Sequence, residues 1–265
     1  MFPFTNNFEG VGQTMRLVIF AGLAAALVIP SLAAAAGVGN PASLVGRENY
    51  GFVIEVENQK KEVEGDPVES RRYLGKIIWG LRDNIDLYAR LGVSDLRVRA
   101  AGSPTFNGSE GMTYGAGATV RVMEIDAPHM LILFNAQMLS YYSEGEVMVP
   151  MSLDGDSWVE RYDNRYRWNE IQFSVFTTWE RETWEPYMGV TVTNAFGEVK
   201  KDMYRITGGG QEFLGTDSNE FSEDAIAELV LGMDVGLGGT GRLSGEIRIG
   251  EKDLSFVVGL SELYR

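Results

Sequence analysis

Residues 224–265, DAIAELVLGMDVGLGGTGRLSGEIRIGEKDLSFVVGLSELYR, alternate between apolar and polar side chains in three runs that are separated by glycine-rich or charged turns. The apolar positions of the first run are Ala227, Leu229, Leu231, Met233, Val235 and Leu237. Alternation with a period of two predicts β-hairpins that have one apolar and one polar face. The polar face carries full charges beside glycines. Such a face fits either a sheet open to water or a closed cylinder with an apolar outside and a charged lumen.

Seven earlier segments show the same alternation: 48–58, 71–81, 85–93, 112–123, 130–142, 168–180 and 184–196. Together with the last three runs they predict ten strands, with eight as the alternative. The connections mostly alternate between long and short, as in outer-membrane barrels, where short turns lie on the periplasmic side. We therefore expect an all-β, closed, antiparallel up-and-down transmembrane barrel with long external loops. The longest of these, 143–165 and 197–223, are acidic and expected to be irregular.

The N-terminal part of the chain predicts export. A basic residue, Arg16, precedes an apolar run of 13 residues, 17–29, and a stretch of alanines that ends at Ala36. This order is typical of a secretory signal peptide, and the run is too short for a membrane-spanning helix. We expect residues 1–36 to be removed, 37–47 to form a short periplasmic segment, and 48–265 to form the barrel.

Aromatic side chains support a membrane position. Eight of them fall at strand ends on the face expected to point outward: Tyr50, Tyr73, Trp79, Tyr114, Tyr142, Trp179, Trp184 and Tyr264. Aromatic rings gather at both membrane–water interfaces, so these residues predict two girdles. Trp168 is an exception, because the alternation turns it inward unless a bulge shifts the register.

With these features the chain resembles the small outer-membrane β-barrel families of Gram-negative-type bacteria, which have eight to ten strands. The resemblance covers 48–265 and is architectural. It implies location in the bacterial outer membrane, contact with outer-membrane lipid, and insertion by the barrel assembly machinery. The family's closing strand usually ends in an aromatic residue, whereas here Tyr264 is followed by Arg265.

The expected lumen collects charged residues of both signs. They are Glu55, Glu57, Lys76, Asp86, Arg90, Arg121, Glu228, Asp234, Arg242, Glu246 and Arg248. One hypothesis is a network of ion pairs that fills a narrow cylinder, since small barrels have interiors just filled by side chains. The other is a pore or proton path lined by charge.

Few residues point to catalysis or to a metal. The chain has no cysteine and one histidine, His129, which the topology places in a periplasmic turn, so no transition-metal site is expected. Asp154 and Asp156 are weak candidates for calcium or magnesium, and the acidic external loops for divalent cations in general. The net charge of −14 argues against nucleic acid. No cofactor is expected.

The sequence favours a structural or surface-interaction role without an enzymatic reaction. A small porin or solute channel is the first alternative. An outer-membrane barrel enzyme acting on lipid or peptide is a second. A soluble periplasmic barrel that binds lipid inside is a third, and it requires the apolar face to point inward.

Overall fold

The computed structural model describes residues 45–63, 66–99, 104–126, 129–153, 156–179, 181, 183–223, 225–251 and 254–264. The chain divides into two compact units, Met1–Leu32 and Ala33–Arg265, and all described residues belong to the second. The expected signal peptide lies outside the described residues, as does Asp154. In the described part of the chain no helix is long and apolar enough to cross a bilayer.

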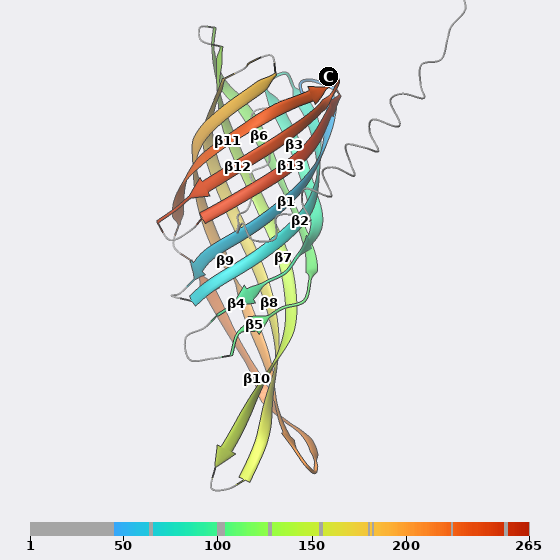
Figure 1. Cartoon of the computed structure of the whole chain (residues 1–265), viewed down its shortest axis with the longest axis vertical. Helices are drawn as coiled ribbons and strands as arrows, with labels where there is room; N and C mark the ends of the chain where they lie inside the picture. Colours follow the sequence, from blue (N-terminus) through green and yellow to red (C-terminus); the bar gives the residue numbers. More distant parts are fainter. Residues whose placement is uncertain are drawn as a thin grey trace, which may run out of the picture. The chain divides into compact units, whose positions relative to one another are not determined.

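Thirteen strands make up the described residues of this unit (Figure 1). They are β1 (Tyr50–Val63), β2 (Asp66–Arg82), β3 (Ile85–Ser94), β4 (Arg97–Val98), β5 (Phe106–Asn107), β6 (Gly111–Ile125), β7 (Met130–Leu153), β8 (Asp156–Trp179), β9 (Trp184–Thr207), β10 (Gly210–Ser222), β11 (Ile226–Gly238), β12 (Gly241–Ile249) and β13 (Leu254–Tyr264).

Ten of these strands close into a ring in the order β1, β2, β3, β6, β7, β8, β9, β11, β12 and β13. The ring closes because β1 pairs antiparallel with both neighbours, so that Tyr50 lies opposite Trp79 on one side and Tyr264 on the other. The short β4 pairs with β2 and β5 pairs with β4, and β10 pairs with β9 outside the ring. The predicted closed antiparallel barrel of ten strands is confirmed.

The pleat of the strands separates an apolar outside from a polar inside. Leu87 and Leu231 are 37% and 38% exposed on the outer surface, whereas Arg90 and Asp234 are 2% and 0% exposed inside. Hydrocarbon-facing leucines and a charged interior are the arrangement of a transmembrane barrel. The soluble lipid-binding barrel, which requires the opposite orientation, is therefore excluded.

The predicted irregular loops at 143–165 and 197–223 are wrong, because most of these residues continue the strands. β7, β8 and β9 have 24 residues each, about twice the length that crosses a bilayer. β7 and β8 remain paired from Met130 opposite Trp179 to Leu153 opposite Asp156. The sequence did not reveal these extensions because charged side chains occupy both faces, which removes the hydrophobic alternation.

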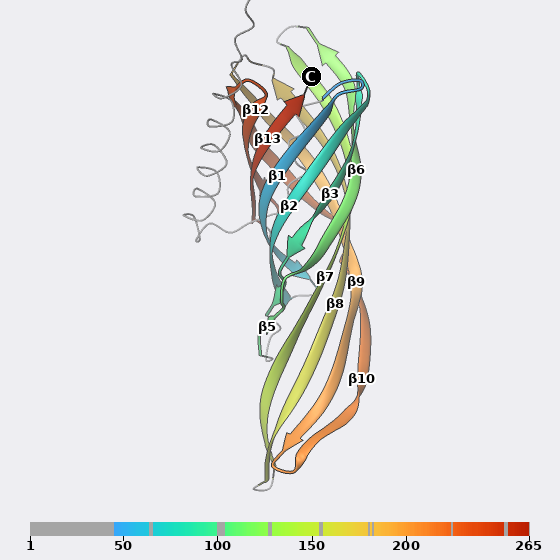
Figure 2. The ribbon, with the colours of Figure 1, turned by 90° about the vertical axis from the view of Figure 1, so that its right-hand side faces the viewer.

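These extensions form a four-stranded sheet beyond the barrel, in the order β7, β8, β9 and β10, which we call the external sheet (144–153, 156–167, 197–207 and 210–222). Figures 1 and 2 show it at the end of the barrel opposite the C-terminal end of β13. The described chain before β1 lies at the same end as Tyr264. There the Val45 side chain is buried against Val53, Ile78 and other apolar residues.

Candidate functional site in the barrel lumen

The structure gathers most of the predicted lumen charges inside the barrel. Nine of the eleven have at most 5% exposure: Glu55, Glu57, Lys76, Asp86, Arg90, Glu228, Asp234, Glu246 and Arg248. Arg242 is partly buried, with 13% of its side chain exposed. Arg121 does not join this group. It lies near the barrel rim, where it pairs with Glu124 at 3.0 Å and donates to the backbone carbonyl of Asp83.

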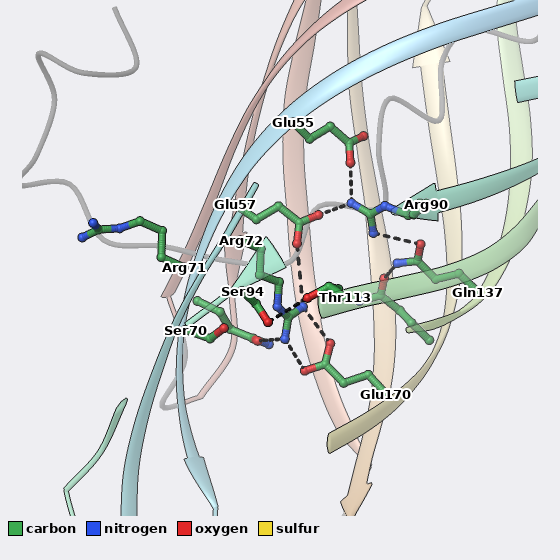
Figure 3. A network of polar contacts seen from close by, with 12 residues as sticks. Glu55, Glu57, Ser70, Arg71, Arg72, Arg90, Ser94, Thr113, Gln137 and Glu170 are labelled. Carbon is green, nitrogen blue, oxygen red and sulfur yellow. Dashed lines mark hydrogen bonds and ion pairs between the residues drawn. The ribbon is translucent and has the colours of Figure 1, made fainter. Parts of the chain in front are cut away.

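One network of ion pairs crosses the lumen between β1, β2, β3 and β8 (Figure 3). The Arg90 guanidinium donates hydrogen bonds to both Glu55 and Glu57. The Arg72 guanidinium binds the two carboxylate oxygens of Glu170 at 2.9 and 2.8 Å, which is the strong bidentate geometry. Glu57 joins the two halves, since its carboxylate lies 3.7 Å from Arg72.

The same network continues toward the external end. Lys61 lies 3.7 Å from Glu170 and 3.9 Å from Glu223, and all three side chains are nearly inaccessible. Gln59 accepts a hydrogen bond from Arg72 at 2.6 Å. Arg72 therefore contacts Glu57, Gln59 and Glu170 directly, and Lys61 and Arg90 are linked to it through Glu170 and Glu57.

A second network lies on β9, β11 and β12. Arg248 contacts Glu246 at 2.7 Å and Glu228 at 3.9 Å, and the Tyr187 hydroxyl donates to Glu246 at 3.0 Å. Arg242 bridges Glu185 at 2.7 Å and Asp234 at 3.7 Å. The inner walls on opposite sides of the barrel are thus both lined by paired charges.

Sequence reasoning missed five charged residues of these networks: Lys61, Arg72, Glu170, Glu185 and Glu223. A signal for three of them was present. Arg72 has the parity of Lys76, Glu170 has that of Gln172, and Lys61 continues the inward column of Glu57 beyond the predicted strand end at 58. Arg72 and Glu170 lie inside the predicted strands 71–81 and 168–180, and extending the alternation of 48–58 by three residues would have found Lys61.

Two tyrosines fill the lumen where the facing strand has a glycine. A Cβ atom at Gly117 would lie 2.4 Å from the ring of Tyr88, and one at Gly232 would lie 2.1 Å from the ring of Tyr187. The Tyr88 hydroxyl reaches Asn135 at 3.1 Å. The glycines on the polar face thus provide the space in which aromatic rings lie across the barrel.

Apolar side chains gather inside the barrel at its external end. The buried cluster there consists of Val68, Leu96, Phe106, Tyr141, Trp168 and Ala195. The indole N–H of Trp168 donates to the Glu170 carboxylate at 2.9 Å, so the cluster and the ionic network touch. Trp168 is buried and points inward, as the alternation predicts, and the pairing of β7 with β8 has no register shift in the described residues. At the other end Val45, Ile78 and Leu263 belong to a second buried cluster.

The aromatic residues predicted for the membrane interface lie on the outer surface. Seven are between 38% and 57% exposed: Tyr50, Tyr73, Trp79, Tyr114, Tyr142, Trp184 and Tyr264. Trp179 is half-buried. The rings of Tyr50 and Tyr264 stack at 4.9 Å across the seam between the first and last strands.

No metal-ligand cluster of three or more histidine, cysteine or acidic residues occurs in the described ranges. His129 is exposed in the turn before β7, where its φ is 59° and its N–H donates to the Asp126 carbonyl. Asp156 is exposed at the tip of the external sheet. Neither residue lies beside the lumen networks.

No family model and no curated protein matches the chain. Among solved structures, the translocator domain of the autotransporter NalP from Neisseria meningitidis has a TM-score of 0.46 and 12% identity, over 97% of this chain and 100% of that one. The outer membrane protease OmpT from Escherichia coli has a TM-score of 0.45 and 9% identity, over 85% and 100%. The β domain of the Bordetella autotransporter BrkA has a TM-score of 0.44 and 16% identity, over 82% and 100%. These proteins are outer-membrane barrels, and at this level of likeness they assign no activity to the chain.

Proposed function

We propose that this protein is an outer-membrane β-barrel with a closed lumen, and that its role is structural and surface-presenting. The observation that supports this role most directly is the burial of the lumen charges. Glu57 and Arg72 have 0% exposure and Arg90 has 2%, so these side chains are almost entirely shielded from water. A conducting pore needs a continuous column of water along such residues, whereas a filled lumen stabilises the wall against collapse.

The external sheet supports the second half of the proposal. It carries Trp158, Tyr162 and Tyr166 on the face that continues the lumen wall. The Lys201 ammonium lies 5.7 Å from the Tyr162 ring centroid, and the Arg205 guanidinium lies 5.6 Å from that of Trp158. Such cation–π pairs hold aromatic rings in place on a surface exposed to water. Interaction through this sheet, and binding of divalent cations at its acidic positions, are parts of the proposal.

Conductance measurements test the proposal. First, outer-membrane fractionation and gel migration with and without boiling establish that the barrel is folded. The full chain is then reconstituted into planar bilayers. We expect a heat-modifiable band in that fraction and no steady conductance. A folded barrel that conducts in discrete, long-lived steps would contradict the closed lumen, and absence from the outer-membrane fraction would contradict the location.

A small cation-selective channel is the second candidate, and the charge balance of the interior favours it. Among the described residues nine buried carboxylates face five buried bases. An opened lumen with this excess would attract cations, so reversal potentials in a salt gradient would identify it. The absence of a reaction is also proposed: replacing His129 with Ala should leave folding and any host phenotype of the protein unchanged.

A further inference from the structure

On one side of the barrel the lipid-facing surface ends in a row of three paired residues. Val56 on β1 lies opposite Tyr73 on β2, and Tyr73 lies opposite Val93 on β3. Toward the external end the next outward positions are polar. Asn58 pairs with Arg71, whose backbone N–H donates to the Asp95 carboxylate at 2.6 Å. The hydrocarbon boundary on this side is therefore fixed at the row of Tyr73.

Basic residues collect directly beyond that row. The cluster, which we call the rim patch, consists of Lys60, Arg71, Arg97 and Arg99 with the two carboxylates Glu69 and Asp95. Lys60 and Arg97 both pair across the sheet with Glu69, from β1 and β4. Glu62 lies on the same outer face of β1, two residues beyond Lys60, so four bases stand against three acids here, a small positive excess in a chain with a net charge of −14.

One carboxylate holds three of these cations. Glu69 lies 3.4 Å from Lys60, 3.9 Å from Arg97 and 3.4 Å from Arg99. The three basic side chains are 49%, 51% and 50% exposed, and Glu69 is 25% exposed. Each guanidinium has five N–H donors and a carboxylate has about four acceptor sites, so most of the donors remain directed to the surroundings.

The depth of the patch matches lipid headgroups. Arg71 lies two residues beyond the Tyr73 row, Lys60 and Arg97 lie four beyond it, and Arg99 lies six beyond it, beside Pro67. On strands that rise about 3.3 Å per residue and tilt by about 45°, these positions correspond to roughly 5 to 14 Å along the membrane normal. The headgroup layer begins at the hydrocarbon edge and is roughly 5 to 7 Å thick. Long arginine side chains can also reach back toward it.

On β8, bases lie opposite and just beyond the interface residue Tyr142, but each faces an acid. Arg167 pairs across the sheet with Glu198, and Arg165 pairs with Glu144 and contacts Asp202 through a hydrogen bond. A balanced rim of this kind has little net attraction for anions. It therefore provides a matched control within the same molecule.

We propose that the rim patch binds the phosphate groups of an anionic lipid in the outer leaflet. Arginine matches phosphate through paired N–H donors, and a basic cluster beside a membrane attracts anionic headgroups. Glu69 gathers the cations in the absence of the lipid and competes with the phosphate for them. The proposal depends on the membrane location but not on whether the lumen is closed.

Lipid retention in nanodiscs tests the site. The full chain is placed in phosphatidylcholine nanodiscs doped with lipid A that carries two phosphates, or with the same lipid after removal of the phosphates, and bound lipid is counted by native mass spectrometry. We expect retention of the phosphorylated form only. The variant R97Q/R99Q should lose affinity by roughly tenfold or more, because each base near an anionic surface contributes to binding. The control R165Q/R167Q should bind as the original chain does.

A further variant changes the binding in the opposite direction. Glu69→Gln removes the competing carboxylate, so it should retain the phosphorylated lipid more strongly, and a merely misfolded barrel cannot give this result. Equal retention of both lipids, equal losses in the two arginine variants, or displacement by millimolar inorganic phosphate would overturn the proposal, the last because the ligand would then be the free ion. Heat-modifiable migration confirms the fold of each variant.

Discussion

The lumen and the external sheet each contain an arginine–carboxylate ion pair, but the two pairs differ in their exposure to water. Inside, Arg72 and Glu170 are 0% and 4% exposed and form two hydrogen bonds. Outside, on the same strand β8, Arg165 pairs with Asp202, and their side chains are 39% and 17% exposed. A buried charge that loses its partner stays desolvated, whereas an exposed one turns to water. The comparison indicates that the buried pairs maintain the barrel and that the outer pairs only adjust a surface.

The largest effect should come from removing one buried cation. Arg72→Met leaves Glu57 and Glu170 facing each other without the guanidinium, and we expect a loss of about 3–5 kcal/mol in the free energy of unfolding. The midpoint of urea unfolding in lipid vesicles, followed by heat-modifiable migration, measures it. The exposed counterpart Arg165→Met should lose at most about 1 kcal/mol.

A double variant separates charge from volume. Replacing Arg72 and Glu170 together by Met removes a cation and an anion, so it should be less destabilising than Arg72→Met alone. If the single and the double variants lose the same free energy, packing and not charge explains the cost of the single change.

The second effect concerns the glycines that admit aromatic rings into the lumen. A Cβ at Gly232 would lie 2.1 Å from the Tyr187 ring, so Gly232→Ala forces the ring to move, and we expect a loss of about 1–3 kcal/mol. Gly245→Ala is the control, since no atom lies within 4 Å of its Cβ position. Tyr187→Leu in the Gly232→Ala background should recover part of the loss. Equal effects at the two glycines in unfolding experiments would contradict this reading.

Shortening the external sheet tests whether the barrel depends on it. Deleting 148–161 and 200–218 and joining each gap with a short turn removes the outer part of all four strands but keeps the lumen networks and the Trp168 cluster. We expect a barrel that still inserts and migrates anomalously without boiling, because its buried pairs are intact. Loss of heat-modifiable migration, with the protein remaining in the aggregated fraction, would show that the sheet is needed for folding.

The two regions also differ in how well the sequence predicts them. The alternation of Leu87 with Arg90, or of Leu231 with Asp234, is required by a bilayer outside and a packed lumen inside. The sequence therefore predicts these strands and the direction of their side chains. On the external sheet most side chains are at least partly exposed, whichever face of the sheet they lie on. Residues such as Glu146 and Lys200 therefore carry no signal of strand position, and β7 and β9 were predicted to end near 142 and 196. Partners inside the lumen were also unpredictable, because Arg72 and Glu170 are 98 positions apart and meet only once the ring closes.

The smallest effect is a dependence of the local stability of the external sheet on pH. The Thr216 hydroxyl donates to Asp202 at 2.6 Å, and with the Arg165 guanidinium beside it this bond lowers the pKa of the Asp202 carboxyl below its ordinary value of 3.8. The pKa of Glu160 is lowered in the same way, by hydrogen bonds from the Tyr162 hydroxyl and the Trp158 indole. A lowered pKa stabilises the folded state above the unfolded pKa, and this contribution is lost as the pH falls through the folded pKa.

We therefore expect the backbone amides of the external sheet to keep their hydrogen-exchange protection factors from pH 7 down to about pH 4 and to lose part of them below it. Asp202→Asn should lower protection slightly at pH 7 and flatten its pH dependence near β9 and β10, whereas amides of β12 should not respond to the substitution. Because the Asp202 carboxylate is at the surface, its substitution should lower stability far less than Arg72→Met does. Protection that is unchanged by both acid and the substitution would mean that the outer ion pairs contribute nothing measurable, and the contrast between lumen and sheet would then be sharper than the structure alone suggests.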